Sequence, residues 1–374
     1  MIDKEFLLKT LKRLLETPSP SGMTDAVVRL VCEILDEIGI EYKLTRRGAI
    51  RASLPGEADS PKRAIAAHID TLGAMVKALK PNGRLEIVPI GFWSSRFAEG
   101  ARMTVYSDNG NYRGTGLPLK ASGHTFNKEI DTQPVDWKQV ELRLDERCAS
   151  VADLMRLGVR VGDTIAVDPG TEFGPNGYIT SRYLDDKAGV ASLLAAAESI
   201  KRKGTKLPLD VLLLFTISEE VGVGASHILH GNDVAEMISV DNATNAEGQN
   251  SSDFGVTVAM MDSAGPFDWH LTRHLLDLCR EHNIEHARDV YRYYRSDAAS
   301  ALEAGNDIRT ALLCFACDAS HGWERTHEDS LMSLARLLAA QMASQPLFHR
   351  DRKALGPLED FPPAEVQTTP DRPL

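Results

Sequence analysis

Apolar residues recur at every third or fourth position in five stretches of the chain, a pattern typical of amphipathic or buried helices. Between these stretches lie short, continuous apolar runs, which predict buried parallel strands. The helical stretches are residues 4–16, 25–38, 190–200, 267–282 and 328–342, and the apolar runs are residues 63–67, 209–217, 237–240, 254–261 and 308–315. Strands that alternate with helices predict an α/β fold, here a three-layer α/β/α domain.

The alternation is interrupted between residues 80 and 175. Gly, Pro and Asn separate short segments there, and helical periodicity is limited to residues 150–157. We therefore predict a small β-rich domain at 80–175, inserted between two parts of the main domain at 1–79 and 176–344. Residues 345–374 are rich in Pro, Asp and Arg without periodicity, which predicts a poorly ordered tail.

The amino-acid composition limits the binding partners and the cellular location that can be expected for this protein. The chain has 374 residues, 43% of them hydrophobic and 25% charged, which is ordinary for a globular protein. The net charge of -11 argues against nucleic acid or an anionic membrane as partner. No apolar run is long enough to span a bilayer, and the charged start of the chain does not resemble a signal peptide. Five cysteines are too few for a disulfide framework, so we expect a reducing cytoplasm.

Two polar motifs stand next to predicted elements. Asp185 and Asp186 precede the helix at 190–200, where acidic residues are favoured simply because they complement the helix dipole. His68 and Asp70 follow the strand at 63–67 and, being two apart, face the same side. A carboxylate beside an imidazole can orient it as a metal ligand. Taken alone, the two aspartates are better explained as helix caps, and His68 and Asp70 are equally explained as a polar strand end that meets water.

Further acids and histidines follow the other apolar runs. Glu219 and Glu220 follow the run at 209–217, Asp241 ends the run at 237–240, and His321 and His327 come after the last run. The carboxyl ends of parallel strands are where α/β folds place their sites. Histidines and carboxylates without cysteine suit two zinc, cobalt or manganese ions that share a bridging carboxylate. Two ions about 3.5–4 Å apart can hold both an attacking water and an amide carbonyl oxygen.

These motifs occur in the order seen in co-catalytic metallo-aminopeptidases. They are HIDTLG at 68–73, LDDKAG at 184–189, SEEVG at 218–222, Val240-Asp241 and the closing His327. The chain resembles most the family of glutamyl and deblocking aminopeptidases that assemble tetrahedral (TET) particles. This resemblance extends from Pro18 to about Ala343 and includes the inserted domain. The segment SHGWERTH at 320–327 resembles a branch associated with the osmoprotectant N-acetylglutaminylglutamine amide.

The resemblance implies a role for each motif residue. His68 would bind one ion with Asp70 orienting it, and Asp185 would bridge both ions. Glu219 would be the general base on the metal-bound water. Glu220, Asp241 and His327 would complete the metal ligands.

The resemblance leaves the last ligand and the substrate contacts open. The family typically separates its Arg-Tyr pair from the final histidine by one more residue, whereas Arg325 here precedes His327 by only two positions. His327 is preferred because a predicted helix follows it directly. His321 stays an alternative ligand or a substrate contact, and Asp297 resembles the family's acidic position that could hold the substrate's amine.

The leading hypothesis is a dinuclear metallo-aminopeptidase that acts on small peptides or on a peptide-like osmolyte. An N-acyl amino-acid deacylase or carboxypeptidase could use the same metal core without binding a free amine. A non-catalytic scaffold that binds partners through the inserted domain is a third possibility, although it would have no need for Glu219. The family forms dimers that build dodecamers, so the resemblance implies a homo-oligomer.

Overall fold

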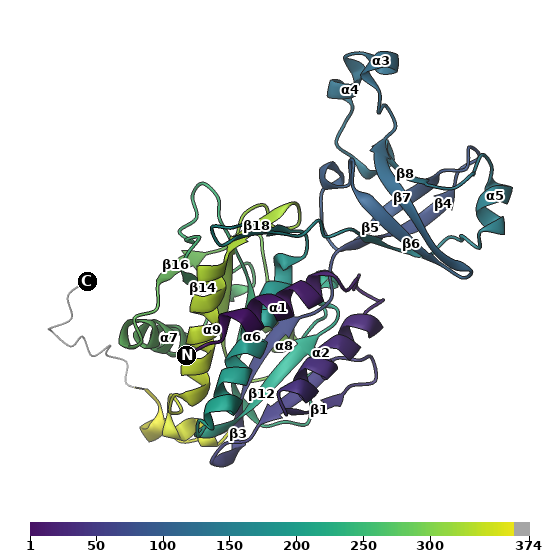
Figure 1. Cartoon of the computed structure of the whole chain (residues 1–374). Coiled ribbons are helices and arrows are strands. Elements are labelled where there is room, and N and C mark those ends of the chain that lie inside the picture. Colours follow the sequence, from purple (N-terminus) through teal and green to yellow (C-terminus); the bar gives the residue numbers. More distant parts are fainter. Residues whose placement is uncertain (363–374) are drawn as a thin grey trace.

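The computed structural model describes residues 1–362, which form a large α/β body and a smaller barrel that stands out from it (Figure 1). A nine-stranded sheet runs through the large body in the order β1-β2-β12-β3-β13-β17-β14-β15, with β16 beside β14. Its strands are β1 (Glu41–Leu44), β2 (Ile50–Leu54), β3 (Ala58–His68), β12 (Leu209–Thr216), β13 (Val234–Thr244), β14 (Val256–Asp262), β15 (Gly265–Pro266), β16 (His286–Val290) and β17 (Arg309–Cys317).

The four central strands, β12, β3, β13 and β17, are mutually parallel. They are buried along almost their whole length, which explains why their sequences are continuous apolar runs without alternation. Their carboxyl ends therefore meet at one edge of the sheet. The run at 254–261 was predicted to be parallel as well, but its strand β14 runs antiparallel to β17 and parallel only to β16. An apolar run reports burial and carries no information on strand direction.

Helices cover this sheet and confirm the three-layer α/β/α architecture. They are α1 (Lys4–Leu15), α2 (Asp25–Glu37), α6 (Leu184–Lys203), α7 (Trp269–Glu281), α8 (Asp297–Glu303) and α9 (Glu328–Ala343). Helix α6 is the central one, because it packs between the sheet strands β3 and β13 on one side and α1 and α9 on the other. It is buried nearly all round and ends at Gly204, which has the left-handed backbone (φ 62°) typical of a helix stop.

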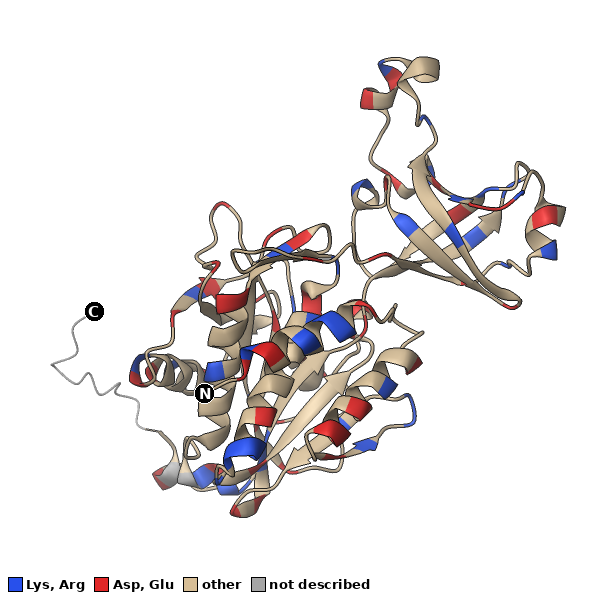
Figure 2. Ribbon diagram, in the orientation of Figure 1, with Lys and Arg blue, Asp and Glu red and all other residues tan. Residues whose placement is uncertain are grey.

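The inserted domain is a closed barrel with the strand order β4-β5-β8-β7-β6-β9. Its strands are β4 (Gly73–Leu79), β5 (Leu85–Ile90), β6 (Arg102–Ser107), β7 (Gly110–Pro118), β8 (Val140–Leu144) and β9 (Thr164–Val167), and short helices are α3 (Gly123–Phe126), α4 (Glu129–Thr132) and α5 (Val151–Arg156). The arm with α3 and α4 extends from the far end of the barrel (Figure 1). Lys and Arg are interspersed with Asp and Glu on both bodies (Figure 2).

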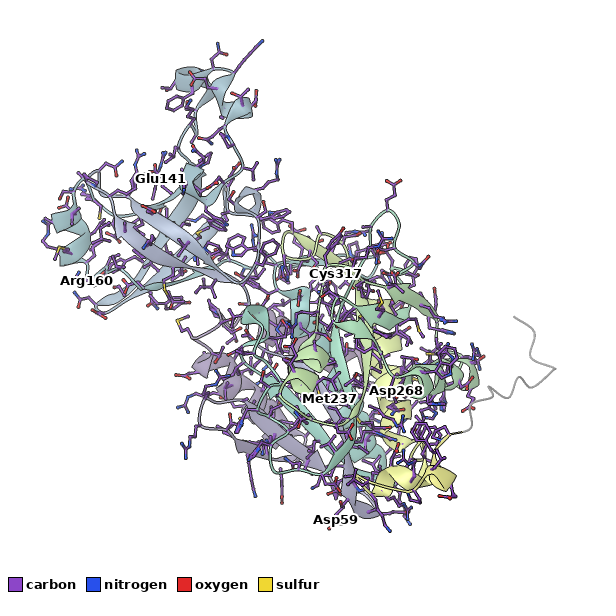
Figure 3. The ribbon with its side chains drawn as sticks, turned by 180° about the vertical axis from the view of Figure 1, so that it is seen from behind. Asp59, Glu141, Arg160, Met237, Asp268 and Cys317 are labelled. Atoms are coloured by element: carbon purple, nitrogen blue, oxygen red, sulfur yellow. The ribbon has the colours of Figure 1, made fainter. Side chains whose placement is uncertain are left out.

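The barrel begins earlier in the chain than residue 80, where the prediction placed it, because β4 already pairs with β5 and β9. Only residues 69–72 separate β4 from β3, so the sequence shows no composition change there. The barrel has its own buried acid, Glu141, which is labelled in Figure 3. Its carboxylate accepts hydrogen bonds from Lys80 and from Arg143. Beyond the barrel, β10 (Glu172–Phe173), β11 (Tyr178–Ser181) and β18 (Glu324–His327) form a separate small sheet on the large body.

The segment after residue 344 was predicted to be poorly ordered. Its described part, up to residue 362, contains the 3-10 helices η4 (His349–Arg352) and η5 (Leu358–Asp360). Leu347 packs against the core, and Asp351 pairs with Arg309 at 2.7 Å, so this part is attached to the large body. Residues 363–374 lie outside the described residues. Across residues 1–362, no helix is long and apolar enough to cross a membrane.

Candidate metal centre

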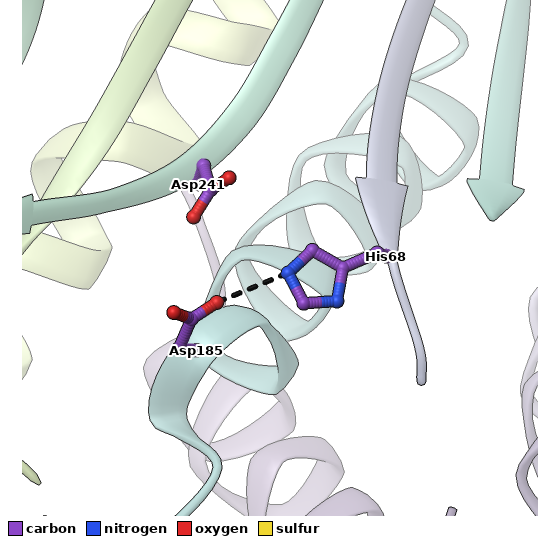
Figure 4. A group of neighbouring side chains, drawn as sticks. All are labelled: His68, Asp185 and Asp241. Atoms are coloured by element: carbon purple, nitrogen blue, oxygen red, sulfur yellow. Dashed lines mark hydrogen bonds and ion pairs between the residues drawn. The ribbon is translucent and has the colours of Figure 1, made fainter. Parts of the chain in front are cut away.

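Three buried side chains converge where the central strands end. His68 is the last residue of β3, Asp241 belongs to the adjacent strand β13, and Asp185 lies at the start of α6 (Figure 4). One ligand atom from each lies within 4.8 Å of the other two, as a shared ion requires. The backbone of Asp185 and Asp186 is not yet helical, so the regular helix begins only after them. Asp185 therefore turns its carboxylate toward the strand ends.

The Asp185 carboxylate faces a histidine with each of its oxygens. Oδ1 lies 3.0 Å from His68 Nε2 (dashed line in Figure 4), and Oδ2 lies 3.2 Å from His321 Nε2. Burial opposes ionisation of Asp185, but hydrogen bonds to His321 and His68 outweigh it and lower the pKa of the carboxyl below its usual range. Asn242 adds a bond from Nδ2 to Oδ2 of Asp185 at 2.7 Å. The geometry suits a carboxylate that bridges two ions.

The ring of His68 is held from behind by Asp70, through the backbone carbonyl and not mainly through the carboxylate. Nδ1 of His68 lies 2.9 Å from the Asp70 backbone carbonyl and 3.7 Å from its carboxylate. An Nδ1–H that donates to this carbonyl leaves Nε2 free to act as a ligand. The Asp70 carboxylate instead accepts the backbone N–H of Glu219 at 3.1 Å and the Ser21 hydroxyl. Asp70 thus contacts two of the predicted site residues, the ring of His68 and the backbone of Glu219.

The neighbours Glu219 and Glu220 leave β12 in the 3-10 helix η3 (Glu219–Val221) and point to different partners. Glu219 Oε2 lies 4.0 Å from His68 Nε2, and its side chain is 15% exposed. Glu220 Oε2 lies 3.6 Å from His321 Nε2, and its side chain is only 3% exposed. Burial raises the pKa of both carboxyls, to about 8 for Glu220. Oε1 of Glu220 is buried without a hydrogen-bond partner.

His327 does not reach this centre, so its predicted place as the last ligand is wrong. Its Nε2 lies 2.9 Å from the Asn176 carbonyl, and its Nδ1 accepts the Asp329 N–H at 3.1 Å as the N-cap of α9. Strand pairing with Tyr178 in β11 fixes this orientation. His321 lies beside Asp185 instead of His327. The left-handed backbone of His321 (φ 64°) turns its loop toward Asp185. The irregular spacing of Arg325 and His327 was the sequence signal for this outcome.

This difference predicts opposite effects for the two histidines. His321→Ala is expected to lose metal, whereas His327→Ala should keep the wild-type metal content and lose only stability, by roughly 1 kcal/mol for a lost helix cap. Metal analysis of the dialysed proteins together with thermal unfolding separates the two effects. Loss of metal from His327→Ala with a full complement in His321→Ala would contradict the placement seen here.

Asp297 is near this region but is engaged elsewhere. Its Oδ2 accepts the Thr216 hydroxyl at 2.6 Å, and its Oδ1 accepts the Ala225 N–H at 2.7 Å. Gly224 permits this close approach, because a Cβ there would lie 1.9 Å from Oδ1. Asp297 therefore anchors the chain that follows Glu220, and a bond to a substrate amine stays a prediction.

Glu324 also belongs to the site, although no sequence motif indicated it. This buried acid in β18 accepts the N–H of Asp185 at 3.1 Å and the N–H of His321 at 3.0 Å. Burial raises its pKa to about 8. No local pattern identifies such a residue, because both of its partners are backbone groups and one lies 139 positions away.

The donor set fits a divalent cation, because His68, Asp185 and Asp241 offer one ligand atom each. Glu220 and His321 lie beside Asp185 and add two further groups of the same chemistry. Within the described part of the chain, no Lys or Arg forms an ion pair with these carboxylates or with Glu219. Buried carboxylates without a cationic partner are costly, and bound cations would supply the missing charge.

An α/β/α domain with histidines and carboxylates at its strand ends has the architecture of a metal-dependent hydrolase. The M42 glutamyl aminopeptidase family matches residues 48–337, and the chain belongs to this family. It is thus a metal-dependent aminopeptidase, a hydrolase of peptide bonds.

Individual relatives agree with this assignment. A Bacillus subtilis (strain 168) protein named "Putative aminopeptidase YhfE" is 36% identical over 332 residues, which cover 88% of this chain and 95% of that protein. The TET aminopeptidase structure from a marine sediment Thaumarchaeota archaeon has the same fold (TM-score 0.83, 19% identity, 91% and 96% coverage). So does Pyrococcus horikoshii TET1 peptidase, whose structure is described as a tetrahedron or a large octahedral shell (TM-score 0.79, 21% identity, 91% and 100% coverage).

Proposed function

We propose that this aminopeptidase is dinuclear, with Asp185 bridging two divalent ions of zinc, cobalt or manganese. The observation that carries the proposal is that the two oxygens of Asp185 face His68 at 3.0 Å and His321 at 3.2 Å. Asp241 completes the ligands on the His68 side, and Glu220 completes them on the His321 side. Potential ligands on both sides of one carboxylate are the arrangement that a bridging group requires.

Two bound ions would lower the pKa of a water molecule and polarise the amide carbonyl. The protein's own contribution to proton transfer comes from Glu219. The Glu219 side chain is the more exposed of the two glutamates, 15% against 3% for Glu220, and it lies 4.0 Å from His68. Glu219 takes a proton from the attacking water and returns it to the leaving amine. Asp70 holds the Glu219 backbone in place for this task.

The proposed substrates are small peptides or a peptide-like osmolyte of the N-acetylglutaminylglutamine amide type. The five cysteines are all free, which supports a reducing, cytoplasmic location. A homo-oligomer is proposed because related structures are described as large assemblies, among them a dodecamer of PhTET1.

Exhaustive chelation is expected to abolish hydrolysis of aminoacyl substrates, and Zn²⁺, Co²⁺ or Mn²⁺ should restore it. Metal content is measured on the same samples, so that a loss of activity can be assigned to the loss of metal. Full activity at a metal content near zero would refute the proposal. Assaying N-acyl substrates and the osmolyte in parallel identifies the bond that is cut, since cleavage of N-acyl substrates alone would indicate a deacylase instead.

A further inference from the structure

Glu324 connects the two residues on either side of the second proposed ion. The carboxylate lies in β18 and is 2% exposed. Oε2 accepts the backbone N–H of Asp185, and Oε1 accepts the backbone N–H of His321. The side chains of these same two residues approach each other to 3.2 Å. The Glu324 carboxylate thus fixes the backbone of Asp185, the proposed bridging ligand, and the backbone of His321, which is far from Asp185 in the sequence.

His321 needs such support because its own loop is poorly suited to hold it. His321 (φ 64°) and Ala319 (φ 51°) both have the left-handed backbone that non-glycine residues rarely adopt. A second support comes from the inserted barrel, where the Phe92 carbonyl lies 2.6 Å from His321 Nδ1. The Phe97 ring packs on Gly322 so closely that a Cβ there would lie 2.7 Å from it. The loop is held between Glu324 and the barrel.

The same bonds argue that Glu324 is not itself a ligand. Both of its oxygens are occupied by backbone N–H groups, and no Lys or Arg in the described chain forms an ion pair with it. The contacts of this buried carboxylate are the two backbone amides that it holds, those of Asp185 and His321. Residues of this kind, behind metal ligands, typically change metal affinity by ~10–100-fold when they are mutated.

We propose that Glu324 is a positioning residue that sets the geometry between Asp185 and His321 and so the affinity for the second ion. This inference rests on the proposed dinuclear function. The Phe92 carbonyl completes the arrangement by holding the His321 ring, which makes the barrel a structural part of the same metal site.

The test is a titration of metal-free protein with Co²⁺, followed by calorimetry and by the visible absorption of the bound ion. Glu324→Gln keeps the size of the side chain but has only one acceptor oxygen, so one N–H loses its partner. Affinity for the second Co²⁺ should fall ~10–100-fold, with an altered absorption band, while the first ion changes less. Glu324→Asp keeps the charge but draws the carboxylate back, so it should also weaken the second ion.

Asp289 provides a matched control away from the centre. It is buried and likewise accepts two backbone N–H groups, from Asn250 at 2.9 Å and from Val290 at 2.8 Å. Asp289→Asn should lower the unfolding temperature but leave Co²⁺ binding intact. The inference is overturned if either Glu324 variant binds both ions with wild-type affinity, or if Asp289→Asn loses the second ion equally. A wild-type protein that binds a single Co²⁺ would instead refute the dinuclear function.

Discussion

Replacement of Asp185 by alanine is expected to eliminate the binding of both ions and, with it, the peptidase activity. Each oxygen of this carboxylate faces a different histidine, so both ions lose a ligand at once. The loss should exceed the ~10–100-fold fall in affinity typical of residues that only support a ligand. Metal analysis after dialysis, together with the hydrolysis rate of an aminoacyl substrate, measures both effects.

His68→Ala is the informative comparison, because His68 contacts only one side of Asp185. This variant should weaken mainly one ion and retain the other through Glu220 and His321. The unfolding temperature of the metal-free proteins controls for damage to the fold, since both residues are buried. A full complement of two ions in Asp185→Ala would show that this carboxylate does not bridge.

Replacement of Glu219 by glutamine is expected to give an enzyme that binds metal normally and turns over slowly. Glutamine keeps the size of the side chain and one carbonyl oxygen, but it cannot take a proton from water. Loss of a general base typically costs ~10²–10⁴ in rate, so kcat should fall by about that factor while KM changes little. Steady-state kinetics on protein with measured metal content provide the test.

Glu220→Gln is the matched variant at the adjacent position and should behave in the opposite way. Glu220 is enclosed and lies 3.6 Å from His321, where an uncharged amide is a poorer ligand. Metal occupancy itself should therefore fall. If Glu219→Gln lost metal while Glu220→Gln kept it, the two roles would be exchanged. Full metal and full activity in Glu219→Gln would eliminate the proposed proton transfer.

The apolar pattern of the chain predicted the α/β/α architecture, and the order of its motifs indicated where a metal site would lie. Continuous apolar runs report burial on both faces, and burial on both faces requires helices on each side of the sheet. The parallel direction of β3 and β13, which the apolar runs did not report, brings His68 and Asp241 to one carboxyl edge. The place of Asp185 at a helix start indicated only a cap, and its role as a ligand came from the resemblance of the motifs.

The residues that the loops bring back to that edge could not be predicted from the sequence. His321 and His327 are six positions apart in the sequence, and their directions depend on strand pairing with β11 and on a left-handed turn that no apolar pattern reports. The roles of Glu324 and of the Phe92 carbonyl depend on hydrogen bonds with residues 139 and 229 positions away. Periodicity records which face of an element is buried, whereas contacts between distant loops depend on packing of the whole chain.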